Sequence, residues 1–233
     1  MKHIKIFSLT SEYETAKSGG TLITPNVSLI NEDNSVRYLP ELDSHIEYEY
    51  VDLGLPSGLK WATCNIGAAS PEEYGLYFAW GETTGYTADD VTSGIRAFNE
   101  DTYNTGPAAS ISADLTLEQD AAHVNMGGNW RMPTKDEFQE LVDNCNVVWI
   151  NDYNGTGING LIFTSNINMN SIFFPAAGSP RDSLMGINAI CFYYTMSYYS
   201  SSNSYSFMRT NGSPNMINST GRYLGETVRA VCE

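Results

Sequence analysis

Side chains that commonly carry out catalysis are few in this chain and form no known catalytic pattern. There are only three histidines, His3, His45 and His123, so a histidine-based triad or metal cluster has little to draw on. The sequence contains no GxSxG nucleophile motif, no HExxH zinc motif, no phosphate-binding loop and no GxGxxG motif after a strand. His123 falls on a predicted short helix, where a structural role is favoured. These observations predict a protein that is not an enzyme.

The cysteines and the acidic clusters offer no clear metal site. The four cysteines lie far apart, with no CxxC pair and no histidine at ligand spacing: Cys64, Cys145, Cys191 and Cys232. Buried free thiols are the favoured interpretation, and two disulfides are the alternative. The acidic pairs Asp89 with Asp90 and Glu100 with Asp101 lack the spacing of a calcium-binding loop, so solvated charge is favoured over a calcium site. We predict no cofactor and no metal.

Residues 187–220 have the composition of a binding surface. Eighteen of these 34 residues are Tyr, Ser or Asn, and the only charged one is Arg209. Tyrosine supplies a large contact area with a polar tip, while Ser and Asn supply adaptable hydrogen bonds, as in antibody loops. An ordinary exposed surface carries about a quarter charged residues. The composition therefore predicts contacts with a ligand.

The same residues also lack four amino acids whose codons end only in a purine. Lys, Glu, Gln and Trp are absent from residues 187–220, and every residue present except Met196, Met208 and Met216 can be encoded by a codon that ends in a pyrimidine. At their rate of about 13% in residues 1–180, roughly four or five were expected. A mutational process acting on the first two bases of AAY-type codons would leave this mark. A chance composition of Ser- and Tyr-rich strands is the alternative.

The charge balance argues against two large classes of partner. Twelve basic and 27 acidic residues give a net charge of -15, which repels a nucleic-acid backbone and anionic lipid. With 42% hydrophobic and 17% charged residues the chain should fold, and no apolar run is long enough for a membrane helix. The first ten residues lack the features of a secretory signal. We expect no nucleic-acid partner and no membrane insertion.

Short strands and a few capped helices must position these residues. Residues 50–53 and 59–62 flank a turn rich in Gly and Pro, which is typical of a hairpin. Thr134 with Glu137 forms a capping box and predicts a helix of about three turns. Its core-facing side chains follow at helical spacing: Phe138, Leu141, Val142 and Cys145. Shorter helices are predicted from Ser70 and over residues 117–124. Helices early and strands late predict an α+β fold.

Residues 1–45 differ from the rest of the chain. Strands are predicted over residues 26–30 and 36–38, with a turn over residues 31–34 between them. A segment this short is expected to be too small to bury a core alone. We therefore predict an N-terminal β-rich extension for attachment or assembly, an acidic boundary near residue 45, and a main domain over residues 46–233.

Five separated blocks of the main domain resemble a paralogous surface-protein domain of gut Bacteroidetes. The blocks are residues 50–68, 77–82, 127–134, 174–178 and 221–233. That family is similar to the C-type lectin fold, in the branch shared with formylglycine-generating enzymes and with variable proteins of diversity-generating retroelements. Where the family usually has YYWSSS, residues 192–197 are FYYTMS. The resemblance implies a C-type lectin-like domain with an altered binding face. Residues 1–45 resemble leader regions of tail-associated proteins from phages of these bacteria.

Together these observations predict a ligand-binding protein of receptor-binding or adhesin type. We expect the variable protein of a diversity-generating retroelement, either phage tail-associated or cellular, on a virion or a bacterial cell surface. Its partner would be a host or bacterial surface protein or glycan, and by family analogy it would form a homotrimer. The alternatives are a fixed-specificity surface adhesin or glycan-binding module, and a formylglycine-generating-type oxidase. The widely separated cysteines disfavour the oxidase.

The predicted ligand contacts all lie in the Tyr-, Ser- and Asn-rich stretch. They are Cys191, Phe192, Tyr194, Ser197, Tyr198, Tyr199, Ser202, Asn203, Tyr205, Arg209, Asn211, Asn215 and Asn218. Five aromatic residues are expected to be exposed on one surface: Phe192, Tyr194, Tyr198, Tyr199 and Tyr205. Because side chains alternate along a strand, Tyr193 and Phe207 are expected to point inward.

Overall fold

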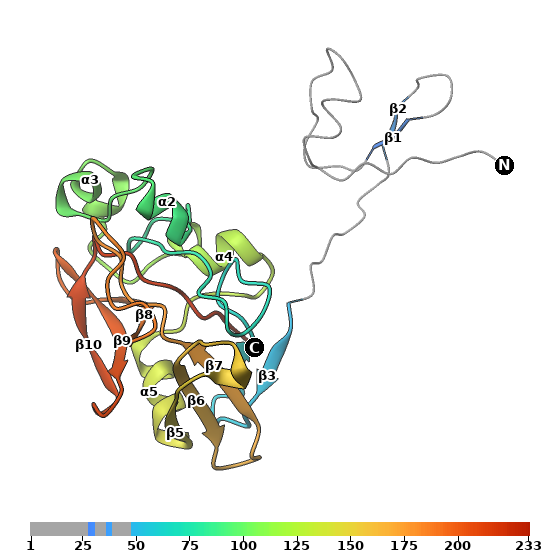
Figure 1. Ribbon diagram of the computed structural model, residues 1–233. Helices are drawn as coiled ribbons and strands as arrows, with labels where there is room; N and C mark the ends of the chain where they lie inside the picture. The colour runs from blue at the N-terminus through green and yellow to red at the C-terminus, as the bar shows by residue number, and fades with distance from the viewer. Residues whose placement is uncertain (1–27, 31–35, 39–47) are drawn as a thin grey trace. The chain divides into compact units, whose positions relative to one another are not determined.

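The computed structural model describes residues 28–30, 36–38 and 48–233 (Figure 1). The chain divides into two units, Met1–Glu47 and Tyr48–Glu233. In the first unit, β1 (Ser28–Ile30) and β2 (Val36–Tyr38) pair antiparallel, which confirms the two strands predicted there. The turn predicted between them and the boundary predicted near residue 45 lie outside the described residues, as does most of the predicted attachment element.

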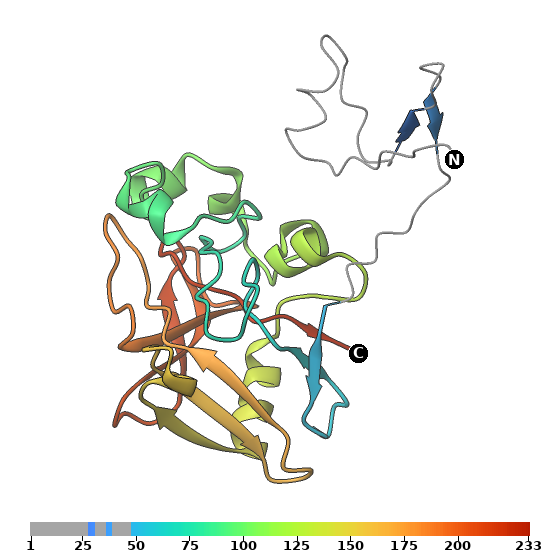
Figure 2. The same cartoon turned by 45° about the vertical axis from the view of Figure 1, so that its right-hand side comes forward.

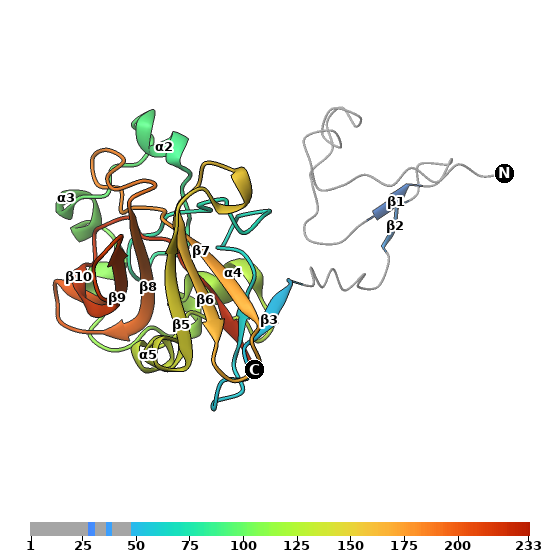
Figure 3. The same ribbon diagram turned by 60° about the horizontal axis from the view of Figure 1, so that its bottom comes forward.

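The second unit contains three antiparallel sheets of three strands each (Figure 3). The first sheet has the order β11-β4-β3 and consists of β3 (Tyr50–Asp52), β4 (Lys60–Ala62) and β11 (Val231–Cys232). The second has the order β5-β6-β7 and consists of β5 (Cys145–Ile150), β6 (Gly160–Ser165) and β7 (Ser171–Pro175). The third has the order β10-β9-β8 and consists of β8 (Ile190–Tyr198), β9 (Asn203–Thr210) and β10 (Met216–Gly221). The hairpin predicted in the first sheet is confirmed, since Val51 pairs with Trp61 across β3 and β4.

The predicted α+β, C-type lectin-like fold is wrong, because the structure is β-rich, with 29% strand and 19% helix. Apart from one longer helix, α5, the helices are short: α2 (Ala88–Thr92), α3 (Glu100–Asn104), α4 (Ala121–Met126) and the 3-10 turns η1 (Pro107–Ser110), η2 (Leu117–Gln119) and η3 (Tyr153–Gly155). The helix predicted from Ser70 is a turn, in which the Ala69 N–H donates to the Glu73 carboxylate. Across the described ranges, no helix could cross a membrane, since none is both long and apolar enough.

A break at Asp120 explains why the helix predicted over residues 117–124 is divided. The Asp120 carboxylate accepts hydrogen bonds from the N–H groups of Ala122 and His123, at 2.8 and 3.0 Å, and so begins α4 anew. Its other oxygen accepts from the Met132 N–H at 2.8 Å. A capping side chain favours a helix start at its own position, so the preceding residues form only the short turn η2.

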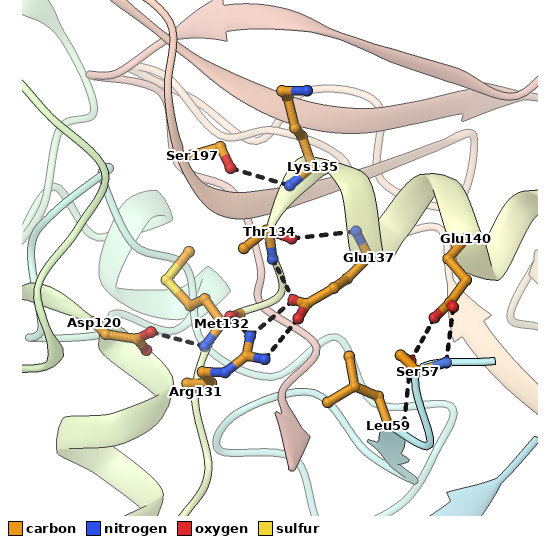
Figure 4. Close-up of polar contacts among 10 residues, drawn as sticks. All are labelled: Ser57, Leu59, Asp120, Arg131, Met132, Thr134, Lys135, Glu137, Glu140 and Ser197. Atoms are coloured by element: carbon orange, nitrogen blue, oxygen red, sulfur yellow. Dashed lines mark hydrogen bonds and ion pairs between the residues drawn. The ribbon is translucent and has the colours of Figure 1, made fainter. Parts of the chain in front are cut away.

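The longest helix, α5 (Lys135–Asn144), follows the prediction (Figure 4). The Thr134 hydroxyl accepts a hydrogen bond from the Glu137 N–H, and the Glu137 carboxylate accepts one from the Thr134 N–H. Arg131 holds the same carboxylate through two hydrogen bonds of 2.6 and 2.8 Å. The predicted core-facing side chains are confirmed: Phe138, Leu141 and Cys145 are buried, and Val142 packs against them half-buried.

The ring of Phe138 contacts side chains from all three sheets. It stacks on Phe207 of β9, with 4.7 Å between ring centroids and 9° between planes. It also meets Trp61 of β4 at 5.1 Å and Phe174 of β7 at 6.0 Å. Figures 1 and 2 show α5 beside the second and third sheets, which it contacts along several strands. This aromatic contact therefore fixes where the third sheet, with the predicted ligand contacts, sits on the core.

Candidate functional site

The predicted contact stretch forms the third sheet, and its inner side belongs to the core. Tyr193 pairs with Phe207, and Phe207 pairs with Ile217, so these side chains form one row across the three strands. Tyr193 and Phe207 are fully buried, which confirms that both point inward. The Tyr193 hydroxyl donates to the Pro175 carbonyl at 2.7 Å, so even its polar tip is used inside the protein.

Three of the predicted ligand contacts are wrong, because Cys191, Tyr194 and Ser197 are buried. Cys191 lies two residues before Tyr193 and shares its inward side, and burial raises the pKa of its thiol. The Tyr194 hydroxyl donates to the carbonyls of Gly221 and Leu224, at 2.9 and 3.0 Å, so the turn after β10 covers this ring. Ser197 accepts a hydrogen bond from the Lys135 N–H at 3.1 Å (Figure 4). These three side chains hold the sheet to its surroundings.

Tyr198 is half-buried and belongs to a stack of charged and aromatic groups. The Arg222 guanidinium lies over two neighbouring rings, 4.7 Å from the Tyr198 centroid and 4.4 Å from that of Trp80, and these two centroids are 6.3 Å apart. Arg222 is fully buried and donates to the Ile111 carbonyl at 2.8 Å. The Tyr198 N–H donates to the Asp114 carboxylate at 2.7 Å. We call Trp80, Arg222 and Tyr198 the arginine stack; it supports the base of the β8–β9 hairpin.

An exposed aromatic cluster stands on this base. Tyr199 is 53% exposed, and its ring meets the half-buried Tyr205 ring edge to face, with 5.1 Å between centroids and 89° between planes. The Lys135 ammonium lies 5.5 Å from the Tyr205 centroid. The hydrogen bond from Lys135 to Asp136 raises the pKa of this ammonium, so it remains charged. We call Tyr199, Tyr205 and Lys135 the tyrosine corner, which combines apolar ring faces, two hydroxyls and a cation.

The remaining predicted contacts divide between the two ends of the sheet. Ser202 is exposed and Asn203 is half-buried in the hairpin beside the tyrosine corner. At the opposite end of β9, Arg209 is half-buried and donates to the Val147 carbonyl and to the side chain of Asn215. Asn211 and Asn218 are exposed. With eight residues in β9, the two ends lie about 25 Å apart. The predicted contact residues therefore lie too far apart to bind one small molecule together.

An apolar row crosses the outer side of the third sheet. Phe192 pairs with Met208, and Met208 pairs with Met216, so the three side chains follow one another across β8, β9 and β10. All three are half-buried. This row lies toward the Arg209 end of the sheet and adds adaptable thioether side chains to the exposed surface.

Sequence reasoning missed the residues that join this surface from elsewhere in the chain. Lys135 belongs to the capped turn of α5, and Asp114 lies in a loop, 70 and 91 residues before Tyr205. Trp80 lies in the block of residues 77–82, yet nothing in its spacing along the sequence connects it to Tyr198. Only the tertiary packing brings these groups together, so no local pattern could have found them.

His123 and the four cysteines of the second unit lie where a structural role is favoured. The Nδ1 atom of His123 lies 3.2 Å from the Trp130 carbonyl, where an Nδ1–H donates. The four cysteines are free, as the favoured interpretation predicted, but only Cys145 and Cys191 are buried, while Cys64 and Cys232 are half-buried.

The acidic pairs lie at helix starts. The hydrogen bonds from Thr87 to Asp90 hold the pKa of this carboxyl below its usual value. Glu100 and Asp101 occupy the first turn of α3, where the helix dipole favours negative charge. In the described part of the chain, no three candidate metal-ligating side chains gather at one place.

Comparisons with protein-family models, with curated proteins and with solved structures give no match to this chain. We therefore infer a function from the side chains that the protein presents at its surface.

Proposed function

We propose that this protein is a ligand-binding protein of receptor-binding or adhesin type. It contacts a protein or glycan on a host or bacterial surface through the exposed parts of the third sheet. The observation that carries this proposal is the tyrosine corner, in which Tyr199 and Tyr205 stand beside Lys135 at the edge of the sheet. Clustered, partly exposed aromatic rings with a nearby cation are typical of binding surfaces, where tyrosine is enriched.

The extent of the surface favours a macromolecular partner. Exposed predicted contacts occur at both ends of strands that span about 25 Å. The apolar row of Phe192, Met208 and Met216 lies on the side of the sheet opposite to Tyr205, because Tyr205 shares the side of Phe207 in β9. A standard protein interface uses some 20 to 30 residues on each side, which an area of this kind can supply. A small ligand could contact only one end of it.

Diversification of this surface by a retroelement is part of the proposal. The stretch lacks Lys, Glu, Gln and Trp, and its exposed positions include Tyr199, Ser202, Asn211 and Asn218. Changes at exposed positions usually alter stability by less than about 0.5 kcal/mol. The buried inner row and the arginine stack keep the sheet in place while such positions change. The resemblance of the five sequence blocks to a paralogous surface-protein domain of gut Bacteroidetes supports a binding role at a cell surface.

Binding of the labelled full chain to a panel of intact gut Bacteroidetes cells tests the proposal. We expect saturable binding to some strains, and a loss of at least tenfold in affinity for the double variant Tyr199→Ala and Tyr205→Ala. The matched control is Tyr50→Ala, because Tyr50 is 51% exposed and also has a lysine, Lys60, 5.2 Å from its ring centroid. Equal binding by the double variant and this control would contradict the proposed surface. Protease and periodate treatment of the cells would distinguish a protein from a glycan partner.

The diversification has its own test in the genome. We expect a reverse transcriptase gene nearby and a template copy of the segment that encodes residues 187–222. Differences between gene and template should fall on codons of exposed residues such as Tyr199 and Ser202. A locus without these two elements would leave a fixed-specificity adhesin.

A further inference from the structure

A concave site lies apart from the tyrosine corner, between the loop of residues 81–86, Arg96 and the turns η1 and η2. Figure 1 shows these segments in the green part of the chain. Its volume is about 440 Å³, within the usual range of ligand pockets. None of the residues of the tyrosine corner lines it. Its polar lining consists of Glu82, Thr83, Thr84, Arg96, Glu118 and Gln119. We call it the Glu82 pocket.

The walls of the Glu82 pocket are held by contacts that do not involve a ligand. Gly81 has a φ of +80°, and a Cβ at this position would lie 2.5 Å from the Ile111 side chain, so glycine allows the loop to turn against this wall. The Thr83 carbonyl accepts a hydrogen bond from the Asn125 side chain at 2.9 Å. The carbonyl of Ile111 is held by Arg222. The pocket is therefore preformed.

An ion pair fixes the charge inside this pocket. Arg96 donates to the Glu82 carboxylate at 2.6 Å, and the two side chains are only 11% and 19% exposed. The Arg96 guanidinium also lies 5.1 Å from the Tyr86 centroid and 4.9 Å from that of Phe98. With Arg96 neutralised by Glu82, the exposed Glu118 leaves the lining with one surplus negative charge. A phosphate or a carboxylate would find no free cation here.

The geometry points to a neutral saccharide as the ligand of the Glu82 pocket. Sugar hydroxyls both donate and accept, so they can bind the carboxylates of Glu82 and Glu118 and the hydroxyls of Thr83 and Thr84 without breaking the ion pair. Gln119 accepts the Thr116 N–H through its oxygen, and within the described residues its NH₂ group has no partner, so it can donate. Pro107, Ala108 and Ile111 supply an apolar wall for the C–H faces of a sugar ring.

Saturation-transfer NMR on the full chain tests this site, with glucose, galactose, mannose and N-acetylglucosamine as probes. We expect a saturable signal from at least one of these sugars. The variant Thr84→Trp, which places a large ring in the pocket from an exposed position, should weaken it at least tenfold, as should Glu82→Gln. The control is Thr92→Trp, because Thr92 is an exposed threonine of α2 that does not line the pocket.

The outcomes separate this site from the proposed binding surface. The double variant Tyr199→Ala and Tyr205→Ala should bind the sugar as the unmodified chain does, whatever its effect on cell binding. If Glu82→Gln fails to fold, Thr84→Trp still decides the question, since it alters no buried group. No saturable signal from any of the four sugars, a signal unchanged in Thr84→Trp, or displacement of the sugar by inorganic phosphate or glycine would overturn the assignment.

Discussion

Two pairs of tyrosines in the third sheet have opposite surroundings although they lie within 13 residues of one another. Tyr193 and Tyr194 are fully buried, and their hydroxyls donate to backbone carbonyls at 2.7 to 3.0 Å. Tyr199 and Tyr205 meet edge to face at the surface. A Tyr- and Ser-rich composition therefore serves both a core and a contact surface. What distinguishes them is whether another segment covers the ring and accepts its hydroxyl proton.

The serines and threonines of the sheet show the same division. The hydroxyls of Thr195 and Ser206 are buried and pair with the Tyr205 carbonyl and the Thr220 hydroxyl, each at 2.8 Å. Ser202, in the hairpin, is exposed. A buried hydroxyl that loses its partner costs about 1 to 3 kcal/mol, whereas an exposed one exchanges its partner for water. The buried half therefore tolerates far fewer substitutions than the exposed half.

The largest expected effect on stability is at Phe138, which packs beneath the buried side chains of the third sheet. Phe138→Ala removes the ring that stacks on Phe207 and touches Trp61, and should lower the free energy of unfolding by about 3 to 5 kcal/mol. Urea unfolding followed by circular dichroism measures this. The exposed neighbour Gln139→Ala on the same helix is the control and should change stability by less than about 0.5 kcal/mol. Equal effects of the two variants would remove Phe138 from the core.

Glu226 should make the stability of the buried half depend on pH. Its carboxyl is fully buried, and burial raises its pKa from 4.5 to about 7, while the Thr220 hydroxyl donates to it at 2.8 Å. Because the folded state holds this proton more tightly than the unfolded state does, the contribution of Glu226 to stability should be fully present below pH 4.5. This contribution should fall by about 3 kcal/mol as the pH rises through 7.

Unfolding of Glu226→Gln across this pH range checks the assignment. The variant cannot ionise, so its stability should change less between pH 4.5 and pH 8 than that of the unmodified chain. Identical pH profiles for the two proteins would show that Glu226 does not titrate in this range.

An intermediate effect is expected where only a hydroxyl is removed from the buried half. Tyr194→Phe leaves the carbonyls of Gly221 and Leu224 without this donor and should cost about 1 to 3 kcal/mol. The same change at the exposed Tyr199, Tyr199→Phe, should be nearly neutral, because water solvates this exposed side chain in both the folded and the unfolded state. Thermal unfolding of both variants measures the difference. If the two lose the same stability, the division into buried and exposed halves does not hold.

The smallest effect on stability is expected at the tyrosine corner itself. Tyr199→Ala should change the free energy of unfolding by less than about 0.5 kcal/mol, because the ring is 53% exposed. Its amide hydrogen-exchange pattern should match that of the unmodified chain over β8 and β9. A cooperative loss of protection in these strands would mean that Tyr199 holds the sheet together.

Local patterns predicted the parts of this fold that depend on neighbours in sequence. The capping box at Thr134 with its apolar repeat gave α5, and strand alternation placed Tyr193 and Phe207 inside. The same reasoning overestimated the helices, because the residues after Ser70 form only a turn and Asp120 divides the helix predicted over residues 117–124 into η2 and α4. The fold class followed this error, since strands account for 29% of the structure and helices for only 19%.

The candidate site was predicted only in part, for a different physical reason. Alternation identifies the two sides of a strand, but not which side another segment covers. The pairing of β8 with β9 shifts register between Tyr194 and Tyr198. The regular alternation of inward and outward side chains therefore does not continue through the whole strand. Tyr194 is then covered by the turn at Gly221 to Leu224, which is remote in sequence. Lys135 joins the site through packing alone.

The arginine stack has a consequence for the thermodynamics and rate of association. Two aromatic rings and the Ile111 carbonyl hold the Arg222 guanidinium at the foot of the hairpin. The backbone next to Tyr199 therefore loses its conformational freedom when the chain folds, before any partner arrives. Binding need not include that ordering cost, so more of the contact free energy remains as affinity. Association should accordingly proceed without a slow conformational step, at rates set by encounter and orientation.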